Sequence, residues 1–338
     1  MQYTWFRVAL CLAGLLSCAL GFPDPRWRRC DRVNDRPIIG ILTQFDDKNR
    51  SQEYIAGSYV KFVEAAGARA VPIRCTASKE ELHTLFHSIN GLLIPGGSAD
   101  LSLGHHFYDA AKVIFDLAIE SNRNGNVFPI WGTCLGFETL NILAAGDNST
   151  VLSAGGKFES HDYPSPVTLT EKVSKSRLLE FMPRHILRAM QTQNITYNSH
   201  SQGVSPEIFL GNEKLDGFFD LLGTYVDKKG KPFVAMVEAR NLPIYGVQFH
   251  PEKAPFEWHK PSQIPHEPEA IFLSGYFADF FVDEARCNSH AFKGGFKEEC
   301  ESVIQQSCDR HVVHPNEYFA EVYQWDVPSQ LDALSTIE

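Results

Sequence analysis

The chain has 338 residues, of which 43% are hydrophobic, and this is enough for one large domain with a sizeable core. Acidic residues outnumber basic ones by 41 to 31, and the resulting net charge of −10 argues against nucleic acid as a partner. The sequence contains neither an internal repeat nor a low-complexity segment.

The first 21 residues have the pattern of a secretory signal peptide. Arg7 precedes an apolar run, Val8–Leu20, and the small residues of Ala19-Leu20-Gly21 suit a signal peptidase. The run is shorter than the ~20 residues that span a bilayer, and no later segment is long and apolar enough to do so. We therefore expect residues 1–21 to be removed, and residues 22–338 to form a single soluble domain without a membrane partner.

The first half of the mature chain alternates strands and helices. Its expected elements are the strands Ile38–Phe45, Ala70–Arg74, Gly91–Pro95 and Val127–Trp131, and the helices Glu53–Ala66, Lys79–Ser88 and Phe107–Ser121. Ser78 and Glu81 form a capping box at one of these helix starts. Such alternation is typical of an α/β fold whose central sheet is mostly parallel, with helices on both faces and functional sites at the carboxyl ends of the strands.

The second half has a different pattern. Its expected elements are a helix at Leu135–Ala145, an antiparallel hairpin of Leu221–Val226 and Phe233–Ala239, a strand at Ile244–Phe249 and a long helix at Glu269–Arg286. The proline-rich segment 251–268 is expected to be a loop near the site. Residues 291–338 carry no pattern that we can assign.

Cys134 is the first candidate catalytic residue. It lies in Gly132-Thr133-Cys134-Leu135-Gly136, between the expected strand and the expected helix, so a sharp glycine-flanked turn should project its side chain into a cleft. The helix N-terminus beside it favours thiolate over thiol, which predicts a nucleophile. The alternative is a buried cysteine that serves as a small hydrophobe.

A base for this nucleophile is present in the motif Gln248-Phe249-His250-Pro251-Glu252. Pro251 cannot donate within a sheet, so His250 should lie at the end of a strand. Glu252 is placed to hold the imidazole tautomer, which would complete a Cys/His/Glu relay.

These two motifs resemble the class I glutamine amidotransferase superfamily and, within it, the γ-glutamyl hydrolases. Other matching stretches are Pro37–Leu42, Ala56–Lys61, Asn90–Ser98 and His250–Trp258, and the resemblance covers about residues 37–290. It implies a γ-glutamyl hydrolase fold, a thioester acyl-enzyme, a homodimer, and a lysosomal or secreted location. Neither a cofactor nor a metal is expected.

The resemblance also implies further site residues. Backbone N–H groups of Gly97 and Leu135 would form the oxyanion hole, and Tyr59, His200 and Gln248 would lie at the substrate. Glu138 stands four residues after Cys134, on the same helix face, and is expected to accept a hydrogen bond from the substrate α-nitrogen. From residues alone, Tyr59 would be a core side chain and His200 a solvated loop residue, whereas for Glu138 a solvated helix acid is the less favoured alternative.

The expected reaction is hydrolysis of γ-glutamyl peptide bonds, with poly-γ-glutamyl folates and antifolates as substrates. The chain contains no synthase domain that could use ammonia, which disfavours the alternative of an amidotransferase-type glutaminase. A secreted binding protein without turnover is the other alternative, although no relay member is substituted.

Three sequons fit passage through the secretory pathway, and they are Asn49-Arg50-Ser51, Asn148-Ser149-Thr150 and Asn194-Ile195-Thr196. Removal of the signal peptide leaves six of the eight cysteines. If Cys134 is free, at least one other must be unpaired within the chain. The closely spaced Cys287, Cys300 and Cys308 predict one local disulfide.

Overall fold

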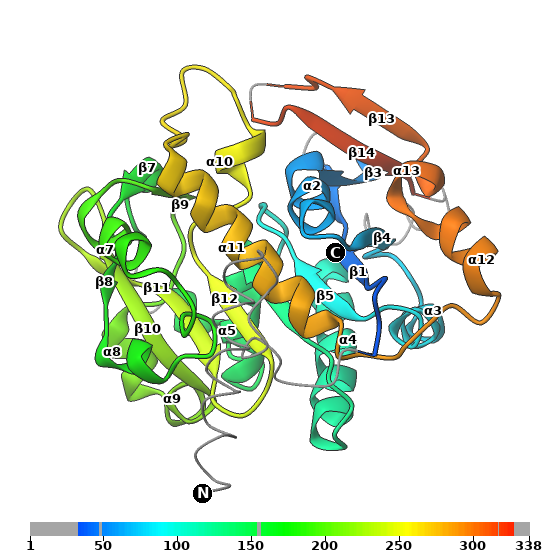
Figure 1. The fold of residues 1–338 in the computed structure, drawn as a ribbon, viewed down its shortest axis with the longest axis horizontal. Coiled ribbons are helices and arrows are strands. Elements are labelled where there is room, and N and C mark those ends of the chain that lie inside the picture. The colour runs from blue at the N-terminus through cyan, green and yellow to red at the C-terminus, as the bar shows by residue number, and fades with distance from the viewer. Residues whose placement is uncertain (1–32, 47–48, 154–156, 317, 328–338) are drawn as a thin grey trace, which may run out of the picture.

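The computed structural model describes residues 33–46, 49–153, 157–316 and 318–327, so the predicted signal peptide lies outside the described residues. Its centre is an eight-stranded sheet (Figure 1). In spatial order the strands are β4 (Arg69–Ile73), β1 (Ile38–Leu42), β5 (Gly91–Ile94), β6 (Ile130–Thr133), β12 (Ile244–Val247), β11 (Pro232–Ala239), β10 (Phe219–Val226) and β8 (Thr168–Leu169).

The first five of these strands are parallel, and the last three continue the sheet in antiparallel fashion. The predicted mostly parallel sheet and the predicted hairpin of the second half are both confirmed. The chain order of the parallel part reverses between β1 and β5, and in doubly wound sheets ligands bind beyond the carboxyl ends of the strands near such a reversal.

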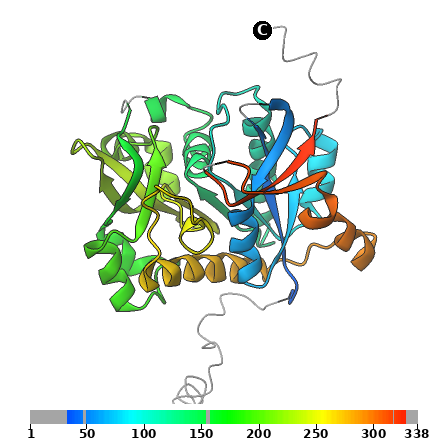
Figure 2. The ribbon, with the colours of Figure 1, turned by 90° about the horizontal axis from the view of Figure 1, so that it is seen from above.

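Helices cover both faces of the sheet, as expected. Side chains alternate along β1, so Ile39 and Ile41 join one hydrophobic cluster while Ile38 and Leu42 join the other. The first cluster includes α2 (Gly57–Ala65) and α11 (Pro268–Ala285), which lie on the same side of the sheet in Figure 2. The second cluster includes residues of α3 (Lys79–Phe86), α4 (His106–Arg123) and α5 (Leu135–Ala144).

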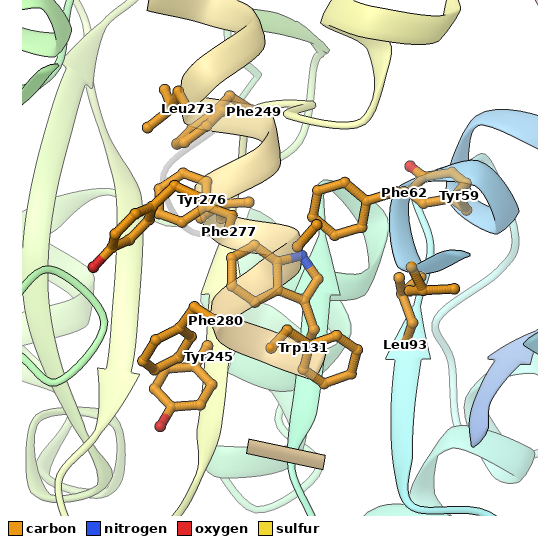
Figure 3. Packing of buried hydrophobic residues seen from close by; sticks show 14 of the residues in the cluster. Tyr59, Phe62, Leu93, Trp131, Tyr245, Phe249, Leu273, Tyr276, Phe277 and Phe280 are labelled. Carbon is orange, nitrogen blue, oxygen red and sulfur yellow. The ribbon is translucent and has the colours of Figure 1, made fainter. Parts of the chain in front are cut away.

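Trp131 is central to the first cluster (Figure 3). It is fully buried, and its ring lies 6.2 Å from that of Phe62 on α2 and 5.5 Å from that of Phe277 on α11. A single aromatic side chain of β6 therefore joins both helices to the strand that precedes Cys134.

The helices over 79–88, 107–121, 135–145 and 269–286 are confirmed, with ends that shift by one or two residues. The capping box is present, because Ser78 Oγ accepts from Glu81 N–H and the Glu81 carboxylate accepts from Ser78 N–H.

The helix predicted over 53–66 is wrong in its first turn. Residues Asn49–Ala56 form strand β3, and α2 begins only at Gly57. Glu53, at the middle of β3, is fully buried and accepts hydrogen bonds from Thr43, Arg74 and Thr76. The hydrogen bonds that the Glu53 carboxylate accepts, together with strand pairing on both sides of β3, outweigh the local preference of these residues for a helix.

A second sheet of four antiparallel strands accounts for part of the unassigned tail. Its order is β13 (Arg310–Val313), β14 (Glu321–Asp326), β3 and β2 (Gln44–Asp46). β14 pairs with β3 from Val322 opposite Ala56 to Asp326 opposite Gln52. Strands near the two ends of the chain thus lie side by side (Figures 1 and 2).

The remaining elements are short segments and a small two-stranded sheet. They are α6 (Thr150–Ser153), β7 (Ser160–Ser165), η2 (Glu171–Lys175), α7 (Arg184–Thr192), β9 (Thr196–His200), α8 (Pro206–Gly211), α9 (Glu213–Phe218), α10 (Lys253–Phe256), α12 (Gly295–Ser302) and α13 (Ile304–Ser307). Within the described residues, no helix has the length and apolar character needed to cross a membrane.

The predicted local disulfide is wrong. Cys287 is disulfide-bonded, but Cys300 and Cys308 are free thiols. Close spacing along the chain does not place these side chains together, because Cys300 lies on α12 beside the Arg69 guanidinium, while Cys308 follows α13 and packs against the first hydrophobic cluster. Cys75 and Cys134 are also free, in line with the expectation of further unpaired cysteines.

Candidate active site

The candidate site lies at one edge of the central sheet, where three parallel strands end level with one another. Ile94 of β5 pairs with Gly132 of β6, and Gly132 pairs with Gly246 of β12. The residues that follow these strands therefore meet at the same edge. They are Gly96 and Gly97 after β5, Cys134 after β6, and Gln248 and His250 after β12.

Cys134 sits on the sharp turn that the sequence predicts. Its backbone has φ 52° and ψ −105°, in the left-handed half of the map that non-glycine residues rarely adopt. The turn requires the flanking glycines, since a Cβ at Gly136 would lie 1.9 Å from the carbonyl oxygen of Ile94, and one at Gly132 would lie 2.6 Å from the carbonyl oxygen of Gly136. Its N–H donates to the Val247 carbonyl at 2.9 Å, which ties the turn to β12.

The ionisation of Cys134 differs from the expectation. Burial raises the pKa of the Cys134 thiol well above its usual value, and the Glu138 and Glu252 carboxylates raise it further. The Leu135 N–H and the Lys253 ammonium group oppose these effects but are weaker. The prediction that the helix N-terminus favours thiolate is therefore wrong, because desolvation and two nearby carboxylates outweigh one backbone donor. The nucleophile starts as a thiol.

His250 and Glu252 form the pair that the motif predicts. The His250 Nδ1 and the Glu252 Oε1 are 2.8 Å apart, and both side chains are buried. Nδ1–H donates to the carboxylate, so the imidazole presents its Nε2 lone pair elsewhere.

Tyr59 is part of the site, and its hydroxyl makes two polar contacts. It accepts from the Gly96 N–H at 2.7 Å and lies 3.4 Å from His250 Nδ1. Burial raises the pKa of the Tyr59 phenol well above its usual value, so the hydroxyl remains protonated. Tyr59 thus belongs to the core, as residue type alone suggests, and also contacts His250 and Gly96, while its role at the substrate stays a prediction.

The catalytic side chains converge on Gly96. A Cβ at this position would lie 2.7 Å from His250 Cε1, 2.7 Å from the Tyr59 hydroxyl and 3.2 Å from Cys134 Cβ. Only glycine leaves room for the nucleophile and the base to face each other here. The adjacent Gly97 is exposed, whereas Leu135, the other predicted oxyanion donor, is buried, and the oxyanion role of both stays a prediction.

Glu138 and Gln248 form a buried pair beside Cys134. Gln248 Nε2 donates to Glu138 Oε1 at 3.0 Å. Burial raises the pKa of Glu138 to about 7, and the hydrogen bond from Gln248 opposes this shift. Glu138 is buried rather than solvated, because α5 turns this face toward the site edge, as its spacing from Cys134 predicts.

His200 lies near His250, at the end of β9, and is buried rather than solvated. Its Nδ1 is 2.6 Å from the Gln202 carbonyl oxygen, and burial lowers its pKa to about 3. The imidazole is therefore neutral, with Nδ1–H as donor and Nε2 as acceptor. Among the described residues, neither His200 Nε2 nor Gln248 Oε1 has a hydrogen-bond partner, so the site contains two buried acceptors that are unpaired.

The three sequons occupy different settings. Asn194 is exposed just before β9, and Asn148 is partly exposed, with its Oδ1 accepting from the Thr150 hydroxyl at 2.6 Å. Asn49 is the first residue of β3. Glycosylation of all three stays a prediction.

Two residues near the site were missed in the sequence. Gln44 contacts the segment after β5. It could have been predicted in the same way as Cys134, because it also follows the end of a strand at this edge of the central sheet. Lys253, the first residue of α10, is close enough to lower the Cys134 pKa, and it has no carboxylate within salt-bridge distance among the described residues. Its ammonium lies 5.2 Å from the ring of Phe319, which belongs to the C-terminal tail.

Comparison with known proteins agrees with this arrangement. Residues 37–252 match the family described as Peptidase C26. The γ-glutamyl hydrolase of Rattus norvegicus is 43% identical over 303 residues, which cover 88% of this chain and 92% of the relative. The γ-glutamyl hydrolase of Homo sapiens is 40% identical, with the same coverage of both chains. γ-Glutamyl hydrolase B of Dictyostelium discoideum is 37% identical and covers 77% of this chain and 75% of its own. With its nucleophile turn and His/Glu pair inside the matched region, this chain belongs to the peptidase C26 family, the family of the γ-glutamyl hydrolases.

Proposed function

We propose that this protein is a cysteine hydrolase that cleaves γ-glutamyl peptide bonds through a thioester. The observation that carries the proposal is the convergence of Cys134, His250 and Tyr59 on Gly96, with the Glu138 carboxylate buried on the helix that Cys134 begins. Family membership makes γ-glutamyl compounds the substrate class.

The reaction follows from the protonation states. Cys134 starts as a thiol, so His250 removes its proton while sulfur attacks the γ-carbonyl carbon. The negative charge that develops on the carbonyl oxygen is stabilised by N–H groups of Leu135 and Gly97. The imidazolium, held by Glu252, then protonates the leaving amine as the C–N bond breaks. Water, deprotonated by His250, hydrolyses the thioester and restores the thiol.

The buried acceptors around Glu138 support recognition of the α-nitrogen of the γ-glutamyl residue. Glu138, the free Gln248 Oε1 and the neutral His200 Nε2 are all acceptors, and the last two lack partners among the described residues. An N–H group is the complement of such a set. Poly-γ-glutamyl folates, the substrates we infer, carry an N–H at this position.

Anionic substrates need a cation, because the protein as a whole is acidic. Lys253 is half-buried beside the site, and although it interacts electrostatically with Glu257, no carboxylate within the described part of the chain lies within salt-bridge distance of it. Every residue of a γ-linked polyglutamate retains a free α-carboxylate, which gives Lys253 a suitable ligand.

Parallel assays test the proposal against its alternatives. We expect the purified protein to shorten a γ-linked pentaglutamate and to release no ammonia from free glutamine, and the sizes of the early products will separate endo from exo cleavage. Release of ammonia with an intact pentaglutamate would indicate a glutaminase. Binding of the pentaglutamate without cleavage would indicate a non-catalytic binding protein.

A secretory route also belongs to the proposal. The disulfide of Cys287 is a bond that oxidising compartments favour, and the exposed sequon at Asn194 is accessible to glycosylation. We infer a lysosomal or extracellular location, which imaging of a tagged protein would test. The homodimer implied by the resemblance stays a prediction, and the mass in solution, measured by light scattering, tests it.

A further inference from the structure

Gln44 is a buried polar residue that the catalytic scheme above does not use. It is the first residue of β2, directly beyond the carboxyl end of β1, and it is 3% exposed. It therefore reaches the same edge of the central sheet as the catalytic residues, from a strand that belongs to the second sheet.

The Gln44 carboxamide binds the backbone on both sides of Gly97. Its Nε2 donates to the Gly96 carbonyl oxygen at 2.9 Å, and its Oε1 accepts from the Ser98 N–H at 3.2 Å. The Gly96 N–H is taken by the Tyr59 hydroxyl. Of the three successive N–H groups, only that of Gly97 has no acceptor among the residues that the structure describes.

Peptide geometry then fixes the direction of that remaining donor. The carbonyl of Gly96 and the N–H of Gly97 belong to one planar trans peptide, so they point in opposite directions. Because Gln44 holds the carbonyl, the N–H must point away from Gln44. The nearest neighbours of a Cβ at Gly97 would all be Gln44 atoms, whereas those of a Cβ at Gly96 would belong to His250, Tyr59 and Cys134. Gln44 and the catalytic side chains thus lie on different sides of this segment.

We propose that Gln44 is a positioning residue that holds the Gly96–Gly97 peptide with its N–H directed at the developing oxyanion. The inference rests on the proposed function. Without the two hydrogen bonds, this exposed glycine peptide can rotate and turn its carbonyl toward the site, where it would repel the oxyanion instead of stabilising it.

The role needs a donor and an acceptor in one side chain. Methionine has a similar volume and provides neither group. Glutamate keeps the acceptor for Ser98, but as a carboxylate it cannot donate to the Gly96 carbonyl. A protonated glutamic acid can donate again, so acidification should partly restore Gln44→Glu but not Gln44→Met.

The experiment is steady-state kinetics on γ-linked diglutamate from pH 4 to pH 8. For Gln44→Met we expect kcat to fall at least tenfold, with KM within threefold of wild type, since the lost interaction acts in the transition state. For Gln44→Glu we expect the same loss at neutral pH, and a ratio of its kcat to that of wild type that rises at least threefold on acidification. The ratio cancels the pH dependence of the remaining site residues, because the wild type and both variants share those residues.

Gln52→Met is the matched control, because Gln52 lies on β3 of the same sheet and outside the site. It should leave kcat unchanged. Wild-type kcat retained within threefold by Gln44→Met, or a raised KM at unchanged kcat, would overturn the positioning role. If Gln44→Met does not fold, the pH dependence of Gln44→Glu tests the proposal on its own. A ratio of its kcat to that of wild type that does not change with pH would then overturn the proposal. Absence of γ-glutamyl hydrolysis by the wild type would instead reject the proposed function.

Discussion

The Gln248 amide donates a hydrogen bond of 3.0 Å to the Glu138 carboxylate, and both side chains are buried next to the nucleophile. Each residue comes from a different strand end, Glu138 through the helix after β6 and Gln248 directly after β12. The pair holds a titratable acceptor at a fixed place in the site, and its charge is the subject of the first two predictions.

Glu138→Gln should lower kcat/KM on γ-glutamyl peptides about tenfold or more. The substitution keeps the shape but removes a charged acceptor, and a hydrogen bond to a charged group contributes ~1.5–3 kcal/mol. Steady-state kinetics above pH 8, where the carboxylate is ionised, measure the effect. Activity within twofold of wild type would show that Glu138 does not contact substrate.

The same variant should be more stable than wild type at high pH and equal to it at low pH. The folded-state pKa of Glu138, about 7, exceeds its usual value of 4.5. The folded state therefore binds the proton more tightly, so this group reduces the free energy of unfolding as pH rises from 4.5 to 7, by about 3 kcal/mol in total. Thermal unfolding of both proteins between pH 4 and pH 8 gives the difference in Tm, which should grow with pH. A difference that is constant across this range would contradict the prediction.

Cys134→Ala should abolish turnover while it leaves the fold and substrate binding largely intact. The thiol makes the covalent bond but contributes little volume to packing. We expect kcat below the detection limit, and calorimetry should show that γ-linked diglutamate still binds. A variant that retained a tenth of wild-type kcat would exclude Cys134 as the nucleophile.

The enzyme should cleave γ-linked diglutamate and leave α-linked diglutamate intact. The two isomers place the scissile carbonyl at different distances from the α-carboxylate, and a misplacement of ~1 Å can cost 10²-fold in rate. Mass spectrometry of matched digests measures both rates. Comparable kcat/KM for the two isomers would contradict this specificity.

Lys253→Met should raise KM for a γ-linked diglutamate, by about fivefold or more, and should affect its α-carboxamide derivative much less. An ion pair with the α-carboxylate explains such selectivity, whereas a general effect of the charge on Cys134 would change both substrates equally. Lys61→Met is the control, because Lys61 already pairs with Glu321 at 2.8 Å. An equal change in KM for both substrates would show that Lys253 acts only through its charge on Cys134 and not by binding the α-carboxylate.

The parallel sheet, most helices and the convergence of Cys134 with His250 were predictable, because each depends on local patterns. The signals for this site are local. They are the glycines that flank the cysteine, the apolar strand before it and the proline after the histidine, and each determines the structure only of residues close to it in the sequence. The predicted elements then bring the motifs together, since parallel strands end at a common edge.

The predictions are wrong where the local structure or the pKa of a residue depends on segments that are distant in the sequence. Glu53 lies in a strand because β14, far along the chain, pairs with β3, and no local signal encodes that partner. The thiol pKa of Cys134 depends on burial and on Glu138 and Glu252, which the helix N-terminus alone cannot represent. Cys300 and Cys308 are neighbours in sequence but lie in different surroundings, so spacing could not predict their state.

The pairing of β14 with β3 also has a consequence for biosynthesis. A ribosome makes β2 and β3 early, but β14 emerges only when translation reaches Glu321–Asp326. Until then β3 has an unpaired edge, and Gln44, on the neighbouring strand, stands on an incomplete sheet. The sheet that supports Gln44 is therefore complete only once β14 has been made.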